Sequence, residues 1–426
     1  MTLGLRFRAA ALLALLFVTL TAAAEPKRRA VSKPFIDFAS PEGWLIANAY
    51  PLASVEPVSY SWDLEPLRAM VGDAAVVGLG DGTHGTREFY TVKLRVIDFL
   101  VRELGFDVVA LEAPFPHCNR LNDYVQGGAG DPRALLRELS GRLSYLFWNT
   151  EETLALIEWM REYNAHRGTR PPIELAGADI HDQLEASKHA VAYLRGVDPA
   201  AAATAEQEYG CMGERLYTFN CTAQATRVYD ALAAREAELV PVTSAREFHD
   251  ALQYARVVVQ SQSYFSARVR DRNMALNALW MRKHRGASGR VILWAHNAHL
   301  TRGPSELAQT DAPAGENLGQ ALGDRYFSIA TMTASGSYTQ WDSRTHVPKV
   351  TTFPPLPEGS YEGYFRLRRM PLLIPLRGTL PPWLVGPARY NEAGVDRDPA
   401  KEAVSLPEKF DAVIFVESTT PARVLP

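Results

Sequence analysis

The chain has few cysteines, little net charge of either sign and no long apolar run after its N-terminus. Its 426 residues include three cysteines, and its formal net charge is −3. This charge balance provides no basic footprint for nucleic acid. The sequence also lacks a Gly-x-Ser-x-Gly nucleophile elbow and a P-loop. These absences argue against a nucleic-acid partner and leave no obvious serine nucleophile.

Residues 1–24 have the pattern of a secretory signal peptide. Two arginines provide the positive region, a short apolar stretch follows at Ala9–Leu20, and three alanines precede Glu25. The apolar stretch falls short of the roughly 20 residues of a bilayer span, so an uncleaved anchor is the lesser alternative. We expect an exported chain, periplasmic or secreted, without stable membrane insertion. It would begin with an exposed basic arm at 25–40 and continue as a hydrolytic domain at 41–426.

The cysteines predict one disulfide. Cys211 and Cys221 are close in sequence, and an exported protein folds where disulfides form. We therefore expect a Cys211–Cys221 bridge, which leaves Cys118 over. Cys118 lies next to His117, but a buried inert thiol is commoner than a nucleophile at such a position.

The hydrophobic pattern predicts an α/β fold with a mainly parallel central sheet flanked by helices. Apolar runs typical of buried parallel strands alternate with helical periodicity, which indicates βαβ units. The expected strands are 74–79, 107–112, 173–178, 290–295, 326–333 and 412–416. Between the third and the fourth strand the pattern is helical, so we predict a long helical insertion or cap at about 182–288. Residues 352–405 are rich in Pro and Gly and are expected to form loops over the sheet edge.

Polar side chains follow four of these strands. In chain order they are Asp81 with His84, Glu112, Asp179 with His181, and His296 with His299. Because the carboxyl ends of parallel strands meet at one edge of a sheet, these groups can converge where ligands bind. A carboxylate beside an imidazole can form an oriented general base, and it would raise the basicity of the histidine. For the first loop alone, a plain turn with a solvated histidine is the competing interpretation.

His296 and His299 have three interpretations. A His-x-x-His spacing occurs among zinc ligands, but the His-Glu-x-x-His pattern of zinc helices is absent. The two histidines could instead be satisfied core residues, or they could contact a substrate or transition state beside Trp294 and Asn297. The residues available favour water activation by a histidine base or metal-assisted hydrolysis.

Six segments resemble, in order, the successive motifs of the erythromycin esterase family. They are 80–89 (GDGTHGTREF), 111–113 (LEA), 270–275 (RDRNMA), 294–299 (WAHNAH), 315–319 (GENLG) and 417–422 (ESTTPA). The resemblance implies hydrolysis of a carboxylic ester or lactone, without a cofactor and without a metal ion. It also raises antibiotic resistance as a candidate role.

The same resemblance implies roles for individual residues. His84 would be the base that activates water, assisted by Asp81, and Glu112 would be a catalytic carboxylate. The remaining matched residues would contact the substrate; they are His296, His299, Lys93 and Arg272. An ion pair with Asp271 or Glu316 would account for Arg272 equally well.

One position departs from the family pattern, because Asp81 stands where the family usually has Glu. Asp is one methylene shorter, so the backbone closes in, or a water fills the gap, or the chemistry is weakened or altered. Two other functions therefore stay open. One is a metal-dependent hydrolase whose ligands are drawn from His84, Glu112, His296 and His299, and the other is a ligand-binding protein without catalysis. A macrolide and other small esters or lactones are all candidate substrates.

Overall fold

The computed structural model describes residues 37–143, 145–212, 220–262, 266–304, 312–342, 345, 347–390 and 403–426. The predicted signal peptide, and most of the predicted arm, lie outside these residues. Phe38–Pro426 form one compact unit. No helix in this described part of the chain combines the length and the apolar composition that crossing a membrane requires.

The centre of the fold is an eight-stranded sheet in the order β1-β9-β10-β6-β2-β5-β3-β4. Six neighbouring strands are parallel: β2 (Val76–Asp81), β3 (Val108–Pro114), β4 (Glu174–Asp179), β5 (Val291–His296), β6 (Tyr326–Thr333) and β10 (Ala412–Val416). They are the six predicted strands, so the mainly parallel α/β fold is confirmed. β2 lies between β5 and β6, and the register places Asp81 beside His296.

Successive strand residues face opposite sides of the sheet, and helices cover both sides. Val77, Val109 and Ile292 pack with α3 (Arg87–Leu104), α4 (Phe115–Val125), α5 (Pro132–Leu143) and α6 (Glu151–His166). The alternate residues Val76 and Val108 pack on the other side, against helices from the segment between β4 and β5. This double cover explains why the strands read as continuous apolar runs rather than as an alternating pattern.

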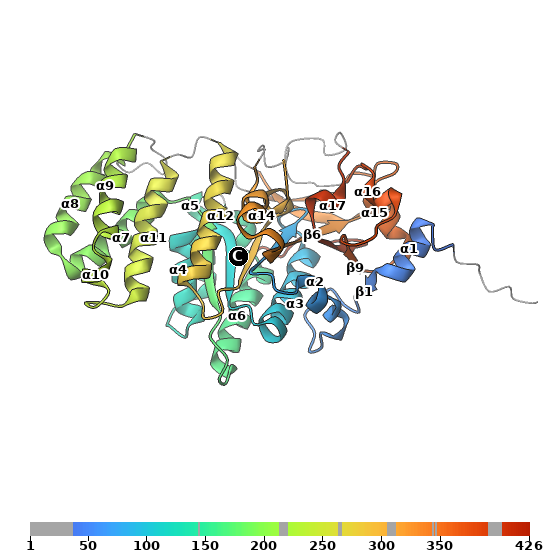
Figure 1. Cartoon of the computed structure of the whole chain (residues 1–426), viewed down its shortest axis with the longest axis horizontal. Helices are drawn as coiled ribbons and strands as arrows, with labels where there is room; N and C mark the ends of the chain where they lie inside the picture. The colour runs from blue at the N-terminus through green and yellow to red at the C-terminus, as the bar shows by residue number, and fades with distance from the viewer. Residues whose placement is uncertain are drawn as a thin grey trace, which may run out of the picture. The chain divides into compact units, whose positions relative to one another are not determined.

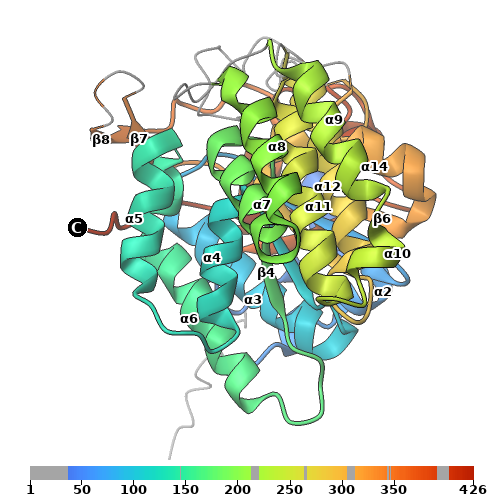
Figure 2. The same cartoon turned by 90° about the vertical axis from the view of Figure 1, so that its left-hand side faces the viewer.

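Every described element between β4 and β5 is helical, as predicted for 182–288. The elements are α7 (Gln183–Val197), α8 (Pro199–Tyr209), η3 (Gly210–Met212), α9 (Thr222–Ala233), α10 (Glu236–Leu239), α11 (Ala245–Ser261) and α12 (Ala267–His284). α12 packs directly on β4, and α11 packs on α7 and α9. In Figure 2, α9–α12 lie on one side of β4, with α5 and α6 on the other. This segment therefore includes a helix layer of the domain itself.

The predicted disulfide is present within this segment. Cys211 and Cys221 are bonded, and their Cα atoms are 5.8 Å apart. Cys118 is a buried free thiol, and burial raises its pKa, so it is an inert core residue rather than a nucleophile.

The C-terminal half of the sheet differs from the prediction of loops at 352–405. β9 (Leu372–Pro375) lies in this region and pairs antiparallel with β10, and β1 (Tyr50–Pro51) pairs antiparallel with β9. β7 (Ser337–Trp341) and β8 (Pro348–Thr352) form a separate hairpin. The prediction was wrong here because β9 is only four residues long and is bounded by prolines, which hide its strand pattern.

The remaining helices complete the layers around the sheet. They are α1 (Pro41–Asn48), α2 (Pro66–Val71), α13 (Asn297–Leu300), α14 (Ala314–Leu322), α15 (Tyr361–Phe365), α16 (Pro382–Val385) and α17 (Leu406–Lys409), with short turns η1 (Trp62–Leu64), η2 (Leu146–Trp148), η4 (Gly323–Arg325) and η5 (Arg366–Arg368). In Figure 1, α1, α15 and α16 lie together near β9. They share a third apolar cluster with β9 and β10.

Candidate active site

The loop between β2 and α3 holds His84 against Asp81. Asp81 is the last residue of β2 and is fully buried, whereas 24% of the His84 side chain is exposed. His84 Nδ1 lies 2.8 Å from Asp81 Oδ2. The turn requires Gly85, because its φ is +75° and an added Cβ would meet the carbonyl oxygen of Thr339. The shorter acid at position 81 thus reaches the histidine directly.

The other oxygen of Asp81 faces a buried lysine, whose pKa burial holds well below its usual range although Glu112 favours the charged form, and an indole. Trp294 Nε1 donates to Asp81 Oδ1 at 2.7 Å, and Lys93 Nζ contacts the same oxygen. Lys93 is fully buried and lies 4.6 Å from the centre of the Trp294 ring. Lys93 was predicted to contact substrate. The structure places it behind Asp81, where it can position the acid and its histidine instead.

Glu112 is the hub of the site. Its Oε1 accepts from Arg270 Nη2 at 2.7 Å and lies 3.2 Å from His299 Nε2. Its Oε2 accepts from the backbone N–H of His296 at 2.9 Å and lies 3.7 Å from His84 Nε2. The ring of His296 is 5.2 Å from that of His84. The structure therefore brings His84, Asp81, Glu112, His296 and His299 into one cluster.

Arg270 was not among the predicted site residues, yet it connects two of the strand ends. Its guanidinium bonds Asp179 Oδ2 at 2.5 Å as well as Glu112, and Tyr145 Oη donates to the same Asp179 oxygen at 2.5 Å. Arg272, which was predicted instead, is exposed on α12 and, among the described residues, makes no hydrogen bond or ion pair with the cluster. Helix phase explains the difference, because Arg270 lies on the same side of α12 as the buried Met274 and Asn277, whereas Arg272 lies on the opposite side.

The environment sets distinct protonation states at the site. Burial lowers the pKa of His84 to about 4, although Glu112 favours the charged form. Burial also disfavours the charged forms of His299 and Glu112, but other charges outweigh it. Asp271 and Glu112 raise the pKa of His299 to about 10, and His299 with Arg270 holds the pKa of Glu112 well below its usual range. Glu112 thus acts on His84 in the direction expected of a carboxylate, but burial outweighs it and the net pKa of His84 is lowered.

Aromatic side chains wall the exposed side of His84. The Phe147 ring stacks on the His84 ring, with centroids 3.9 Å apart. Tyr90 links the two segments, because it accepts from the backbone N–H of Gly85 at 3.1 Å and donates to the carbonyl of Phe147 at 3.0 Å. The Phe147 ring, stacked on His84, limits the directions from which a substrate can approach this histidine.

The arrangement also bears on whether a cation fits. Among the described residues, no group of three or more His, Cys, Asp or Glu side chains has the geometry of a metal site. The carboxylate of Glu112 already faces Arg270 and His299, and although burial opposes this, neighbouring carboxylates raise the pKa values of both. A divalent cation placed among these groups would be repelled by the charges that they carry.

Comparisons with known proteins agree with this architecture. The family model described as erythromycin esterase matches residues 101–419, which include Glu112, Arg270, His296 and His299. Erythromycin esterase type II of Escherichia coli is 25% identical over 334 residues, which cover 69% of this chain and 77% of that protein. A protein of known structure from Bacillus cereus is 25% identical, with a TM-score of 0.79 over 91% of this chain and 98% of its own. A mutant of the erythromycin esterase EreC, in its open conformation, has a TM-score of 0.65 at 19% identity, over 87% of this chain and 98% of its own.

Proposed function

The chain belongs to the erythromycin esterase family, and from this premise we propose that it hydrolyses a small carboxylic ester or lactone with water activated by His84. One observation carries the proposal. His84 is neutral at neutral pH and is held on its Nδ1 side by Asp81, so that its Nε2 lies on the side of Glu112, 3.7 Å from Oε2. A neutral imidazole with one nitrogen fixed and the other available is a positioned general base.

The proton path follows from the tautomer. Asp81 accepts the Nδ1 proton, which leaves the Nε2 lone pair to take a proton from water. The water oxygen then bonds to the substrate carbonyl carbon, and the carbonyl π-electron pair moves onto its oxygen. When the tetrahedral intermediate collapses, the bond to the alkoxide breaks and His84 returns the proton to the leaving oxygen. The products are a carboxylic acid and an alcohol, which a lactone retains in one molecule.

Glu112 serves as an orienting carboxylate. Because its pKa is held well below the usual range, it stays charged and accepts hydrogen bonds rather than donating a proton. Its Oε2 is 3.7 Å from His84 Nε2, too far for a direct hydrogen bond, and one water molecule can contact both atoms. Such a water presents one proton to His84 and the other to Glu112, which directs a lone pair outward.

His296 is the donor best suited to the developing oxyanion. Its Nδ1 accepts from the backbone N–H of Ala298 at 3.2 Å, so in the neutral ring the proton is on Nε2. Burial lowers the pKa of His296, which favours this neutral donor form. Arg270 and His299 add positive charge within the same cluster. Donors fixed before the reaction stabilise charge that appears only in the transition state.

The other two candidate functions receive less support. A metal-dependent hydrolase would need a cation beside the positively charged Arg270 and His299, which is electrostatically unfavourable. A protein that has lost catalysis through Asp81 is disfavoured by the direct 2.8 Å contact of Asp81 with His84. Metal analysis and chelator treatment test the first, and we expect a chelator to have little effect on activity.

We further propose that the chain is exported, as the pattern of residues 1–24 suggests. The Cys211–Cys221 disulfide supports this proposal, because such bonds persist mainly in oxidising compartments. Mass spectrometry of the chain recovered from its natural compartment would show whether residues 1–24 are removed. A cytosolic, uncleaved chain would contradict export.

The decisive experiment is hydrolysis of a panel of p-nitrophenyl esters, aliphatic lactones and a macrolide, with His84→Ala as the control. We expect turnover of at least one class and its loss in the variant. Quenched reactions examined by intact-mass spectrometry should show no covalent acyl-enzyme, since water is the nucleophile. A trapped acyl-enzyme, or a metal ion required for turnover, would overturn the mechanism.

A further inference from the structure

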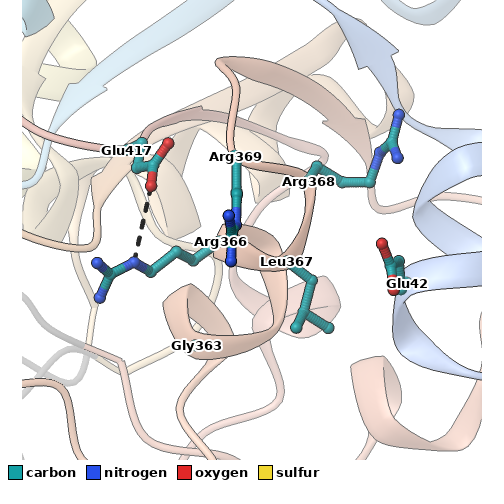
Figure 3. Close-up of a pocket in the computed structure, with 7 residues that line it drawn as sticks. All are labelled: Glu42, Gly363, Arg366, Leu367, Arg368, Arg369 and Glu417. Atoms are coloured by element: carbon teal, nitrogen blue, oxygen red, sulfur yellow. Dashed lines mark ion pairs between the residues drawn. The ribbon is translucent and has the colours of Figure 1, made fainter.

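A second charged region of the molecule shares no residue with the cluster around His84. It is a cavity of about 810 Å³ lined by Glu42, Gly363, Arg366, Leu367, Arg368, Arg369 and Glu417. Figure 3 shows these side chains, which come from α1, from α15 and η5, and from the residue after β10. The cavity has the size of small-molecule sites, which are commonly about 300–1,000 Å³. We call this cavity the arginine pocket, after Arg366, Arg368 and Arg369.

The cations of the arginine pocket are poorly compensated. Arg366 Nε lies 3.8 Å from Glu417 Oε1, at the outer limit of an ion pair. No acidic partner within the described ranges is recorded for Arg368 or Arg369, and Arg368 Nε is buried without a hydrogen-bond acceptor. Three guanidinium groups within four residues repel one another. An anion in the cavity would relieve this repulsion and supply the missing acceptors.

The backbone of the pocket is also unusual. Arg369 has a φ of +49°, in the left-handed region, which is unfavourable for a residue with a Cβ. Its N–H donates to the carbonyl of Arg366 at 3.0 Å, which closes the turn. In Figure 3, Arg366 extends toward Glu417 while Arg368 extends to the side where Glu42 lies. The turn therefore spreads the side chains around the cavity, and strain of this kind is frequent at ligand sites.

We propose that the arginine pocket binds a small molecule that has a phosphate or carboxylate group next to an apolar part. The guanidinium fork matches these oxyanions with two parallel hydrogen bonds. Leu367 is 45% exposed and provides apolar surface at the same cavity. This ligand site is additional to the ester site at His84 and does not depend on the proposed hydrolysis.

Thermal unfolding of the purified full chain tests the proposal with inorganic phosphate as the probe. Sodium chloride at matched ionic strength is the reference, since general screening would act equally in both. A ligand that binds the folded state raises Tm in a saturable way. We expect such a rise with phosphate, and a tighter apparent Kd with phenyl phosphate because Leu367 contacts the ring. Benzoate, in a third arm, distinguishes a carboxylate ligand from a phosphate ligand.

Two matched variants decide whether the arginine pocket is responsible. Arg369→Asn removes one charge and suits the left-handed backbone, and we expect it to weaken phosphate binding about 10-fold or more, alone or combined with Arg368→Gln. Arg325→Gln removes an equally exposed arginine before β6, at the opposite edge of the sheet, and should leave binding unchanged. The absence of any saturable rise beyond that of chloride, for phosphate and benzoate alike, would overturn the proposal. So would equal weakening by Arg325→Gln, or unchanged binding in Arg369→Asn.

Discussion

The cluster around His84, which we call the His84 cluster, and the arginine pocket organise charge in opposite ways. In the His84 cluster, Glu112 is buried and its two oxygens are bonded by Arg270 and by the backbone of His296, with His299 beside them. At the arginine pocket, the Glu417 side chain is 34% exposed and, among the described residues, has one long ion-pair contact, with Arg366. The buried carboxylate has several partners, and the partly exposed one has a single weak partner in the described part of the chain.

This difference indicates that the His84 cluster is suited to catalysis by fixed groups, whereas the arginine pocket is suited to binding a ligand by exchanging its contacts. Buried charges interact strongly and must be compensated. The side chains of the His84 cluster therefore have fixed protonation states and a fixed geometry before a substrate binds. Exposed charges are screened and weakly held, so the arginine pocket can exchange its internal contacts for those of a ligand. Substitutions in the two regions should therefore differ greatly in effect, and they can be ranked.

The largest effect is expected from His84→Ala. Loss of a positioned general base should lower kcat/KM about 10²–10⁴-fold while the fold is retained, because His84 lies in a loop and 24% of its side chain is exposed. Initial rates with the best ester of the panel, together with circular dichroism, measure both. His166→Ala removes an exposed histidine on α6 and is the control. Undiminished turnover in His84→Ala would contradict the assignment of the base.

Glu112→Gln should affect both activity and stability. The amide keeps the shape but removes the charge that faces Arg270 and His299, so we expect kcat/KM to fall about 10²-fold and the free energy of unfolding to fall about 1–3 kcal/mol. Urea denaturation measures the second quantity. Glu162→Gln, at an exposed site on α6, is the control. A variant as stable as the parent would show that the cluster tolerates an uncompensated cation.

The pH dependence should reveal the buried environment of His84. Its folded pKa of about 4 lies below the roughly 6.5 of an exposed histidine, so the base stays neutral until the pH is low. We expect kcat/KM to be level at neutral pH and to fall about tenfold per unit below about pH 4. Because the folded state binds the proton less well, this group also lowers stability as the pH falls from about 6.5 toward 4. An acid limb centred near 6.5 would indicate a solvated histidine.

The sequence was sufficient to predict the half of the sheet that carries the His84 cluster. β2, β3, β4 and β5 are buried on both faces, so each has a mainly apolar sequence with a polar residue at or near its carboxyl end. The common direction of parallel strands then places Asp81, Glu112 and His296 at one edge. The C-terminal antiparallel strand β9 escaped prediction, because its identity depends on pairing with β10 rather than on its own pattern.

The individual side-chain contacts of the His84 cluster were harder to predict than the position of the cluster in the fold. The RDR segment of α12 contains two arginines, and only the phase of the helix decides that Arg270 rather than Arg272 reaches Glu112. Asp271, Met274 and Ala278 are buried on one face of α12. Their spacing in the sequence is helical, so the buried face of the helix could have been predicted from it. No sequence signal indicated Tyr145, which reaches Asp179 only through tertiary structure. Nor did the sequence show that burial would outweigh the charges around His84.

Glu417→Gln should produce the smallest change in stability, and it is the matched counterpart of Glu112→Gln. The same atom change removes a charge whose one ion-pair partner in the described part of the chain is Arg366 at 3.8 Å, so we expect the free energy of unfolding to change by less than about 1 kcal/mol. Removing the acid also makes the arginine pocket more positive, so phosphate should bind more tightly than in the parent chain. Urea denaturation and the phosphate titration of Tm measure the two effects on one sample. A loss of stability as large as that of Glu112→Gln would mean that the Glu417 carboxylate interacts with its neighbours as strongly as the Glu112 carboxylate does, because only a well-compensated charge is costly to remove.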